Sequence, residues 1–133
     1  MRRRLKLSRG RIRRYVDRAL LTLPIRFREA ADNVMVVVES QPTQKDRAGS
    51  RRAVRAFEGA LIRQDPLVGI YRGIPLSERA GYQLVTPDVI AIFRKPLLRI
   101  ARSRRDANEE VRLTVLHEFG HFLGLSEREV EHL

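Results

Sequence analysis

Late in the 133-residue chain stands the sequence His117-Glu118-Phe119-Gly120-His121, inside a segment whose apolar residues recur with helical spacing. Two histidines four positions apart lie on one face of an α-helix, with Cβ atoms roughly 5–6 Å apart. Both imidazoles can therefore reach one metal ion at about 2.0–2.1 Å. Glu118 can hold a water molecule bound to that metal and act as its general base. The segment predicts a zinc site with His117 and His121 as ligands and Glu118 as the catalytic residue.

The surroundings of these three polar residues favour a metal site. Residues 111–125 are otherwise mostly apolar, so the helix should be buried on most sides. Burying two imidazoles and a carboxylate without partners costs roughly several kcal/mol, and a metal ion is one way of satisfying all three. The alternative is a helix whose His and Glu side chains are exposed or hydrogen-bonded in the core, without a metal.

Beyond His121 the pattern extends to H-E-x-x-H-x-x-G-x-x-E. A third ligand can return to the metal only if the helix ends, and Gly124 supplies that ending. Glu127 is then the expected third metal ligand, completing a His₂Glu set with a fourth position open for water. A different explanation of Glu127 is that acidic residues favour the first turn of a helix, here one that begins after Ser126. The competing third ligands are His132 and an upstream carboxylate.

The hydropathy pattern predicts one α+β domain, a small central β-sheet packed against helices. Apolar runs bounded by Asn, Gly and Pro predict three strands. These are Val34–Glu39, Leu67–Arg72 and Val89–Phe93. Residues 40–53 are polar and rich in Arg, which is typical of a loop, and residues 53–63 can form a helix.

Helices are expected at both ends of the domain. Apolar residues between Ile12 and Leu23 recur at helical spacing, Pro24 ends that helix, and residues 25–31 can form a short second one. The long helix with the histidines should begin near Ala107, because Asp106 and Glu109 match a capping box. It should end at Gly124. A short terminal helix is expected after Ser126.

The charge of the chain is strongly positive, with 27 Lys and Arg against 16 Asp and Glu and a net charge of +11. Residues 1–14 hold eight basic residues and no acidic one. We therefore expect residues 1–10 to form a disordered basic arm that can contact nucleic acid nonspecifically, and residues 11–133 to form a single domain. The chain has no cysteine, which excludes disulfides, thiol nucleophiles and Cys-ligated metals.

No segment of the sequence has the length of a membrane span. The longest unbroken apolar runs have five residues, as at 34–38, whereas a transmembrane helix needs about 20. Arginines interrupt the first residues, where a signal peptide has about 7–15 apolar ones. We expect a cytoplasmic protein without a membrane partner; the oligomeric state is left open.

The extended motif resembles the small bacterial zincin-like metallopeptidases, whose pattern is H-E-x-x-H-x-x-G-x-x-[D/E/H] and whose fold is a minimal zincin. Residues 31–39, 68–79 and 92–99 also fit that family, and with 110–125 the similarity covers most of residues 12–133. The resemblance implies a zinc-dependent peptidase that hydrolyses peptide bonds through a metal-activated water. It assigns the metal ligands to His117, His121 and Glu127 and the catalytic role to Glu118. Many relatives have Asp in place of Glu127.

Three residues near the ends of predicted strands are candidates to stabilise the oxyanion of a peptide-hydrolysis transition state. They are Tyr71, Tyr82 and Arg94. Packing or solvation explains each of them better.

Two other functions compete with a peptidase acting on peptide or protein substrates. The first is a non-catalytic domain stabilised by zinc, although such a domain gains nothing from a base at Glu118. The second is a basic nucleic-acid-associated protein, for which aromatic residues interleaved with the basic ones are scarce. Metal content and turnover on unstructured peptides would separate the three.

Overall fold

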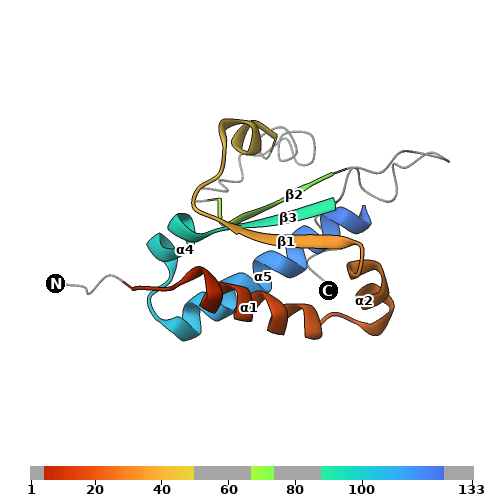
Figure 1. Cartoon of the computed structure of the whole chain (residues 1–133), viewed down its shortest axis with the longest axis horizontal. Coiled ribbons are helices and arrows are strands. Elements are labelled where there is room, and N and C mark those ends of the chain that lie inside the picture. The colour runs from red at the N-terminus through yellow and green to blue at the C-terminus, as the bar shows by residue number, and fades with distance from the viewer. Residues whose placement is uncertain (1–4, 50–66, 74–87, 125–133) are drawn as a thin grey trace, which may run out of the picture.

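The computed structural model describes residues 5–49, 67–73 and 88–124 (Figure 1). Helices precede and follow a small β-sheet along the chain. The elements are α1 (Arg9–Leu21), α2 (Ile25–Ala31), β1 (Val34–Glu39), β2 (Gly69–Arg72), β3 (Asp88–Phe93), α4 (Arg94–Ile100) and α5 (Arg104–Leu123). Residues 44–49 are also helical.

The sheet has three strands in the order β1-β3-β2. β1 runs parallel to β3, with Val36 opposite Ile90, and β2 runs antiparallel to β3, with Tyr71 also opposite Ile90. The central strand β3 is covered on both faces, which explains its continuous apolar run from Val89 to Phe93. A mixed sheet packed against helices confirms the predicted α+β class.

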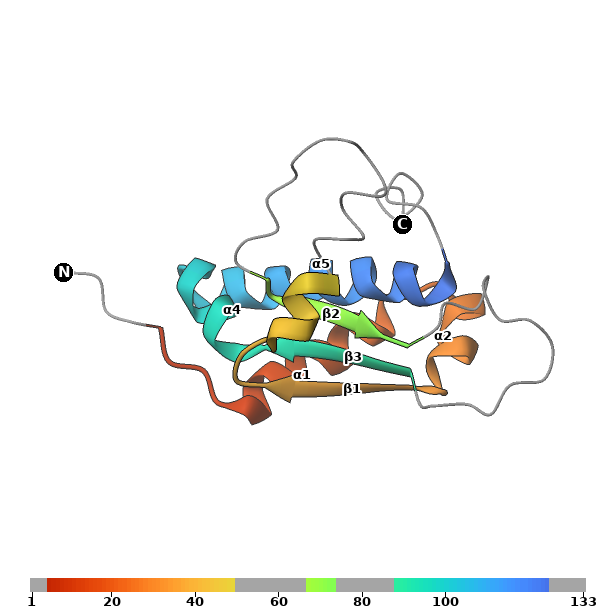
Figure 2. The ribbon, with the colours of Figure 1, turned by 90° about the horizontal axis from the view of Figure 1, so that it is seen from above.

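Helices α1 and α5 cover one face of the sheet, and the helical segment 44–49 lies on the other (Figures 1 and 2). Alternate residues of each strand point to the two faces, so Ile90 and Ile92 of β3 join α1 and α5 in the main core. Ala91 and Phe93 of the same strand form a smaller cluster with Leu67 on the opposite face.

The start of the described chain differs from the expected disordered arm. Leu7 is only 2% exposed and belongs to the main core, and Ser8 caps α1 by accepting a hydrogen bond from the Arg11 backbone N–H. The Arg94 guanidinium donates to the Leu7 carbonyl at 2.7 Å. The burial of Leu7, the Ser8 cap and the Arg94 hydrogen bond together hold this segment against the domain. Residues 1–4 lie outside the described residues.

The predicted bounds of β1 and α2 are confirmed, and β2 and β3 lie within two residues of their predicted starts. The predicted start of α5 was wrong. The helix begins at Arg104, three residues before Ala107, because the Ser103 hydroxyl caps it by accepting from the Asp106 N–H at 3.1 Å.

Two helical segments were not predicted. In α4, Pro96 lies in the first turn, where the missing N–H is tolerated, so it does not mark the end of a strand followed by a loop. Residues 44–49 are helical because Thr43 and Asp46 form a reciprocal capping box, with hydrogen bonds of 2.9 and 3.0 Å. The helices predicted over 53–63 and after Ser126 lie outside the described residues.

Among the described residues, no helix combines the length and the apolar character needed to cross a bilayer.

Candidate metal centre

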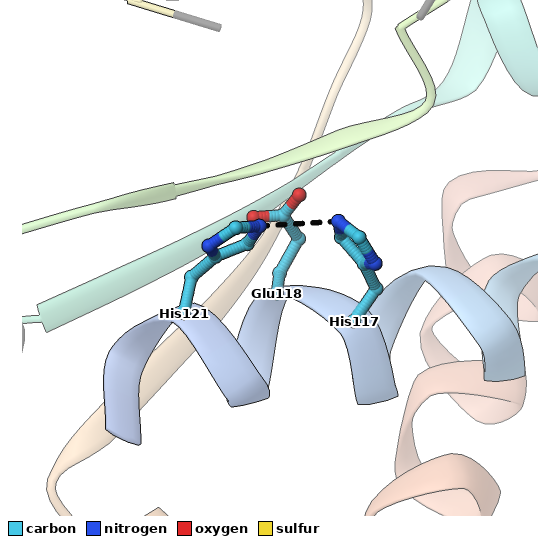
Figure 3. Close-up of side chains that lie close together, drawn as sticks. All are labelled: His117, Glu118 and His121. Carbon is cyan, nitrogen blue, oxygen red and sulfur yellow. Dashed lines mark hydrogen bonds between the residues drawn. The ribbon is translucent and has the colours of Figure 1, made fainter. Parts of the chain in front are cut away.

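Helix α5 brings His117, Glu118 and His121 together near its C-terminal end. The Nε2 atoms of the two histidines are 3.1 Å apart, and their ring centroids are 4.8 Å apart. One ligand atom from each of the three residues lies within 4.8 Å of the others. Figure 3 shows the two imidazoles facing each other from successive turns, with the Glu118 carboxylate between them and directed toward the sheet.

The two imidazoles fit a single metal ion. Two nitrogen ligands at about 2.0–2.1 Å from a tetrahedral ion lie about 3.3 Å apart. The observed separation of 3.1 Å is within a few tenths of that value. Imidazole nitrogens with a carboxylate oxygen form a donor set that zinc accepts readily, and α5 presents the two nitrogens close together.

Glu118 is held from the sheet side of the centre. Glu118 is only 8% exposed, and its Oε2 atom accepts a hydrogen bond of 2.8 Å from the Tyr71 backbone N–H. A buried carboxylate needs hydrogen-bond donors of this kind, because burial disfavours its charged form. The strand therefore fixes where the carboxylate lies relative to the histidines.

The Tyr71 N–H lies on the outer edge of β2. The Phe93 N–H donates to the Val68 carbonyl, so the backbone groups of every second residue from Val68 face β3. Those of Gly69 and Tyr71 face away from β3. Glu118 thus lies beside an edge of the sheet that carries no further strand among the described residues.

Gly69 allows α5 to approach this edge closely. A Cβ atom at position 69 would lie 2.5 Å from Thr114 Cγ2 and 3.0 Å from the Ala91 carbonyl oxygen. Thr114 is one turn before Glu118 on the same side of α5. The missing side chain at Gly69 therefore sets the distance at which Glu118 meets the strand.

A charged network on the other face of the sheet secures β2. The Arg72 guanidinium donates to Glu39 at 2.8 and 3.0 Å and to Asp46 at 2.8 and 2.9 Å. Hydrogen bonds from Arg72 lower the pKa of Glu39. Burial of Asp46 opposes ionisation, but hydrogen bonds from Arg72 and Thr43 outweigh it and lower the pKa of Asp46. The network ties β2 to β1 and to segment 44–49.

The three oxyanion candidates have different positions. The Tyr71 hydroxyl donates to Asp88 Oδ1 at 2.6 Å, and its ring meets the edge of Phe122 with centroids 5.9 Å apart. Arg94 is engaged with the Leu7 carbonyl, at the end of β3 where α4 begins. Tyr82 lies outside the described residues.

The sequence did not indicate two groups near the site. The only signal for Asp88 is an acidic residue at the start of an apolar run, and the Tyr71 backbone N–H leaves no signal in the sequence.

The predicted end of the helix that carries the two histidines is confirmed. Gly124 follows α5 in the left-handed conformation, with φ of 78° and ψ of 21°, and its N–H donates to the carbonyl oxygens of Gly120 and His121. Helix α5 ends at Leu123, two residues after His121. Glu127 and His132 lie outside the described residues, so the third metal ligand stays a prediction.

A small mixed sheet with an H-E-x-x-H helix packed beneath its edge strand is the arrangement of a zincin. The chain belongs to the zincin-like metallopeptidases, because the model of that family matches residues 31–133. The comparison with curated proteins found no match. Helix α1 precedes the matched region, yet Ile12, Val16 and Ala19 lie in the same core cluster as α5, so the domain extends beyond the match.

Proposed function

We propose that this protein is a zinc-dependent peptidase that hydrolyses peptide bonds, with His117, His121 and Glu127 holding the zinc and Glu118 acting as general base. The observation that carries the proposal is the 3.1 Å separation of the histidine Nε2 atoms beside a buried carboxylate. Membership of the zincin-like family supports it. Zinc in this position lowers the pKa of water toward about 7 and polarises a carbonyl group.

Glu118 moves the proton in this reaction. Its carboxylate accepts a proton from the attacking water and delivers it to the nitrogen of the leaving amine. One peptide bond and one water thus become a carboxylic acid and an amine, which are a carboxylate and an ammonium group at neutral pH. The Tyr71 N–H occupies Oε2 and fixes the orientation of the carboxylate before substrate arrives. Proton transfer by a positioned group of this kind typically contributes about 10²–10⁴-fold to the rate.

The peptide substrate binds at the outer edge of β2. An extended peptide can add to an exposed sheet edge through backbone hydrogen bonds. The outer edge of β2 lies beside Glu118 and keeps the Tyr71 carbonyl for a peptide, since the Tyr71 N–H is bonded to Glu118. The other edge strand, β1, lies across β3 from Glu118. A peptide on β2 passes the histidines with its backbone aligned along the strand.

Metal content and peptide cleavage test the proposal together. The wild-type protein should contain one zinc per chain by elemental analysis and should cleave members of a library of unstructured peptides. His117→Ala should lose most of the zinc. Glu127→Ala should weaken zinc binding, and His132→Ala is its matched control.

Each outcome has a defined meaning. Full zinc occupancy in His117→Ala would overturn the metal assignment. Unchanged zinc affinity in Glu127→Ala with a loss in His132→Ala would move the third ligand to His132. Stoichiometric zinc without any cleavage by the wild type would favour a domain that uses zinc for stability alone.

A further inference from the structure

One end of the molecule carries a dense group of exposed basic side chains, which we call the basic end. It is formed by the segment before α1, the start of α1, helix α4 and the start of α5, which lie at the same end in both views (Figures 1 and 2). The basic end consists of Lys6, Arg9, Lys95, Arg99, Arg102, Arg104 and Arg105, all of them exposed.

Packing holds these segments together. The Arg94 side chain, at the start of α4, donates to the carbonyl of Leu7. Leu7, Leu97 and Ala107 belong to one buried cluster, so the segment before α1, helix α4 and the first turn of α5 share a core. The cations that extend from them are therefore fixed on one surface of a folded structure.

Few acidic groups compensate the basic end among the described residues, and Glu109, one turn after Arg105, is paired with Arg112. None of its seven cations forms an ion pair there, whereas Arg13, Arg72 and Arg112 elsewhere each pair with a carboxylate. Asp106 is the single acid in residues 5–11 and 94–106, and its carboxylate accepts from the Arg102 backbone N–H. Helices α1 and α5 also begin here, and their N-terminal ends add positive potential.

We propose that the basic end binds the phosphate backbone of double-stranded nucleic acid without reading its sequence. Five of the seven cations are arginines, whose planar guanidinium groups bind phosphate with two parallel hydrogen bonds. Clustered unpaired cations of this kind bind a polyanion by releasing its condensed counterions.

Two other anionic partners fit the surface less well. Single-stranded nucleic acid is held by bases stacked on aromatic rings, and the basic end contains no aromatic residue. Binding at a membrane surface gains from apolar side chains inserted beside the cations. The exposed large apolar residues of the described chain are Leu21, Ile25, Met35 and Leu113, none of which belongs to the basic end.

This surface is separate from the metal centre. Arg104 and His117 are 13 positions apart on α5, which is about 20 Å at a rise of about 1.5 Å per residue. The inference goes beyond the proposed peptidase function and does not depend on it. Substitutions at the basic end should leave zinc content and peptide turnover unchanged.

Binding to a 30-base-pair DNA duplex, followed by fluorescence anisotropy at several salt concentrations, tests the proposal. The log of the affinity should fall with the log of salt with a slope of about −4 to −6, since each neutralised phosphate contributes about −0.9. Lys95→Gln with Arg99→Gln and Arg104→Gln should weaken binding at least about tenfold and make the slope shallower by about 2 to 3.

The matched control removes the same charge elsewhere: Arg14→Gln with Arg18→Gln and Lys45→Gln, all exposed and without ion pairs among the described residues. It should weaken binding clearly less than the basic-end variant does, because none of these three residues belongs to the basic end. Arg102→Gln with Arg105→Gln is a second basic-end variant in case the first one fails to fold.

Three results would overturn the proposal. Equal losses of duplex affinity in the basic-end and control variants would show that binding depends only on the net charge of the protein. If the wild-type protein does not bind the duplex at ~50 mM salt, double-stranded nucleic acid is excluded as the partner of the basic end. Tight binding to phosphatidylserine vesicles without binding to the duplex would assign the surface to a membrane.

Discussion

The backbone N–H of Tyr71 donates a 2.8 Å hydrogen bond to Oε2 of Glu118, joining the edge strand β2 to the helix that carries both histidines. Gly69, two residues before Tyr71 on β2, lies close to Thr114, which is four residues before Glu118 on α5. Two strand residues span about 6.7 Å and four helical residues about 6 Å, so the two contacts are in register. The close approach at Gly69 thus lies one helical turn before the hydrogen bond to Glu118.

Gly69→Ala should therefore impair the metal centre from a distance. Its Cβ would lie 2.5 Å from Thr114 Cγ2, which forces α5 and β2 apart. We expect peptide turnover to fall at least about tenfold, because small displacements of a positioned catalytic group are costly, with zinc retained and a loss of about 1–3 kcal/mol in the free energy of unfolding.

Thr114→Ser provides the control for Gly69→Ala. Serine lacks the Cγ2 methyl but keeps the hydroxyl that donates to the Glu110 carbonyl. The double variant should recover part of the lost turnover, since the Ala91 carbonyl oxygen remains 3.0 Å from the new Cβ. A double variant no more active than Gly69→Ala would show that the spacing between Gly69 and Thr114 does not position Glu118.

Leu7→Ala should destabilise the whole domain although the residue lies in a basic segment before the first helix. Leu7 is 2% exposed and packs in the main core, and truncating a buried leucine costs about 2–5 kcal/mol. Urea denaturation should show a loss of at least about 2 kcal/mol. The exposed neighbour Lys6→Ala should change stability by less than about 0.5 kcal/mol. Wild-type stability in Leu7→Ala would mean that this segment is not part of the core.

The Arg72 network should make the domain sensitive to acid. The pKa values of Glu39 and Asp46 lie below their ordinary values of 4.5 and 3.8. The unfolded chain therefore binds more protons in this range, and the stabilisation is complete above about pH 4.5 and lost as the pH falls through the lowered values. Urea unfolding between pH 3 and pH 7 measures this directly.

Asp46→Asn isolates one carboxylate of that network. Asp46 is 6% exposed and bonds the guanidinium of Arg72, so its replacement should cost about 1–3 kcal/mol at neutral pH and flatten the acid side of the stability profile. Asp17→Asn breaks an exposed ion pair with Arg13 and should cost less than about 1 kcal/mol. Parallel pH profiles for Asp46→Asn and wild type would refute the assignment.

The left-handed turn at Gly124 should matter for both folding and zinc. A side chain at φ of 78° costs about 1–2 kcal/mol, and relief of that strain would redirect the chain that leads to Glu127. We expect Gly124→Ala to lower the melting temperature and weaken zinc affinity. Gly10→Ala in the first turn of α1 should be neutral or slightly stabilising. Unchanged zinc affinity in Gly124→Ala would show that the turn at Gly124 does not position the third metal ligand.

Local patterns in the sequence predicted much of the fold. The bounds of α2 and β1 follow from Pro24, Asn33 and a β-branched run, and the end of α5 follows from Gly124. The errors arose where two local signals competed. Pro96 marks a helix start as readily as a break, and Asp106 is the capping partner of Ser103 rather than a cap itself.

The candidate site was predictable only where it depends on the geometry of one helix. His117, Glu118 and His121 come together because i and i+4 share a helix face. The hydrogen bond from Tyr71 joins residues 47 positions apart through a backbone group, which no side-chain pattern encodes. The burial of Leu7 likewise depends on tertiary packing in the main core, which the basic composition of residues 1–14 conceals.

Peptide turnover by Glu118→Gln, measured at matched zinc content, tests the proposed peptidase mechanism most directly. Glutamine keeps the size of the side chain, and its amide oxygen can still accept from the Tyr71 N–H, but it cannot take a proton from water. We expect the variant to bind one zinc per chain, to melt at or above the wild-type temperature, and to lose about 10²–10⁴-fold in turnover. Equal turnover by Glu118→Gln and wild type would contradict the assignment of Glu118 as the base.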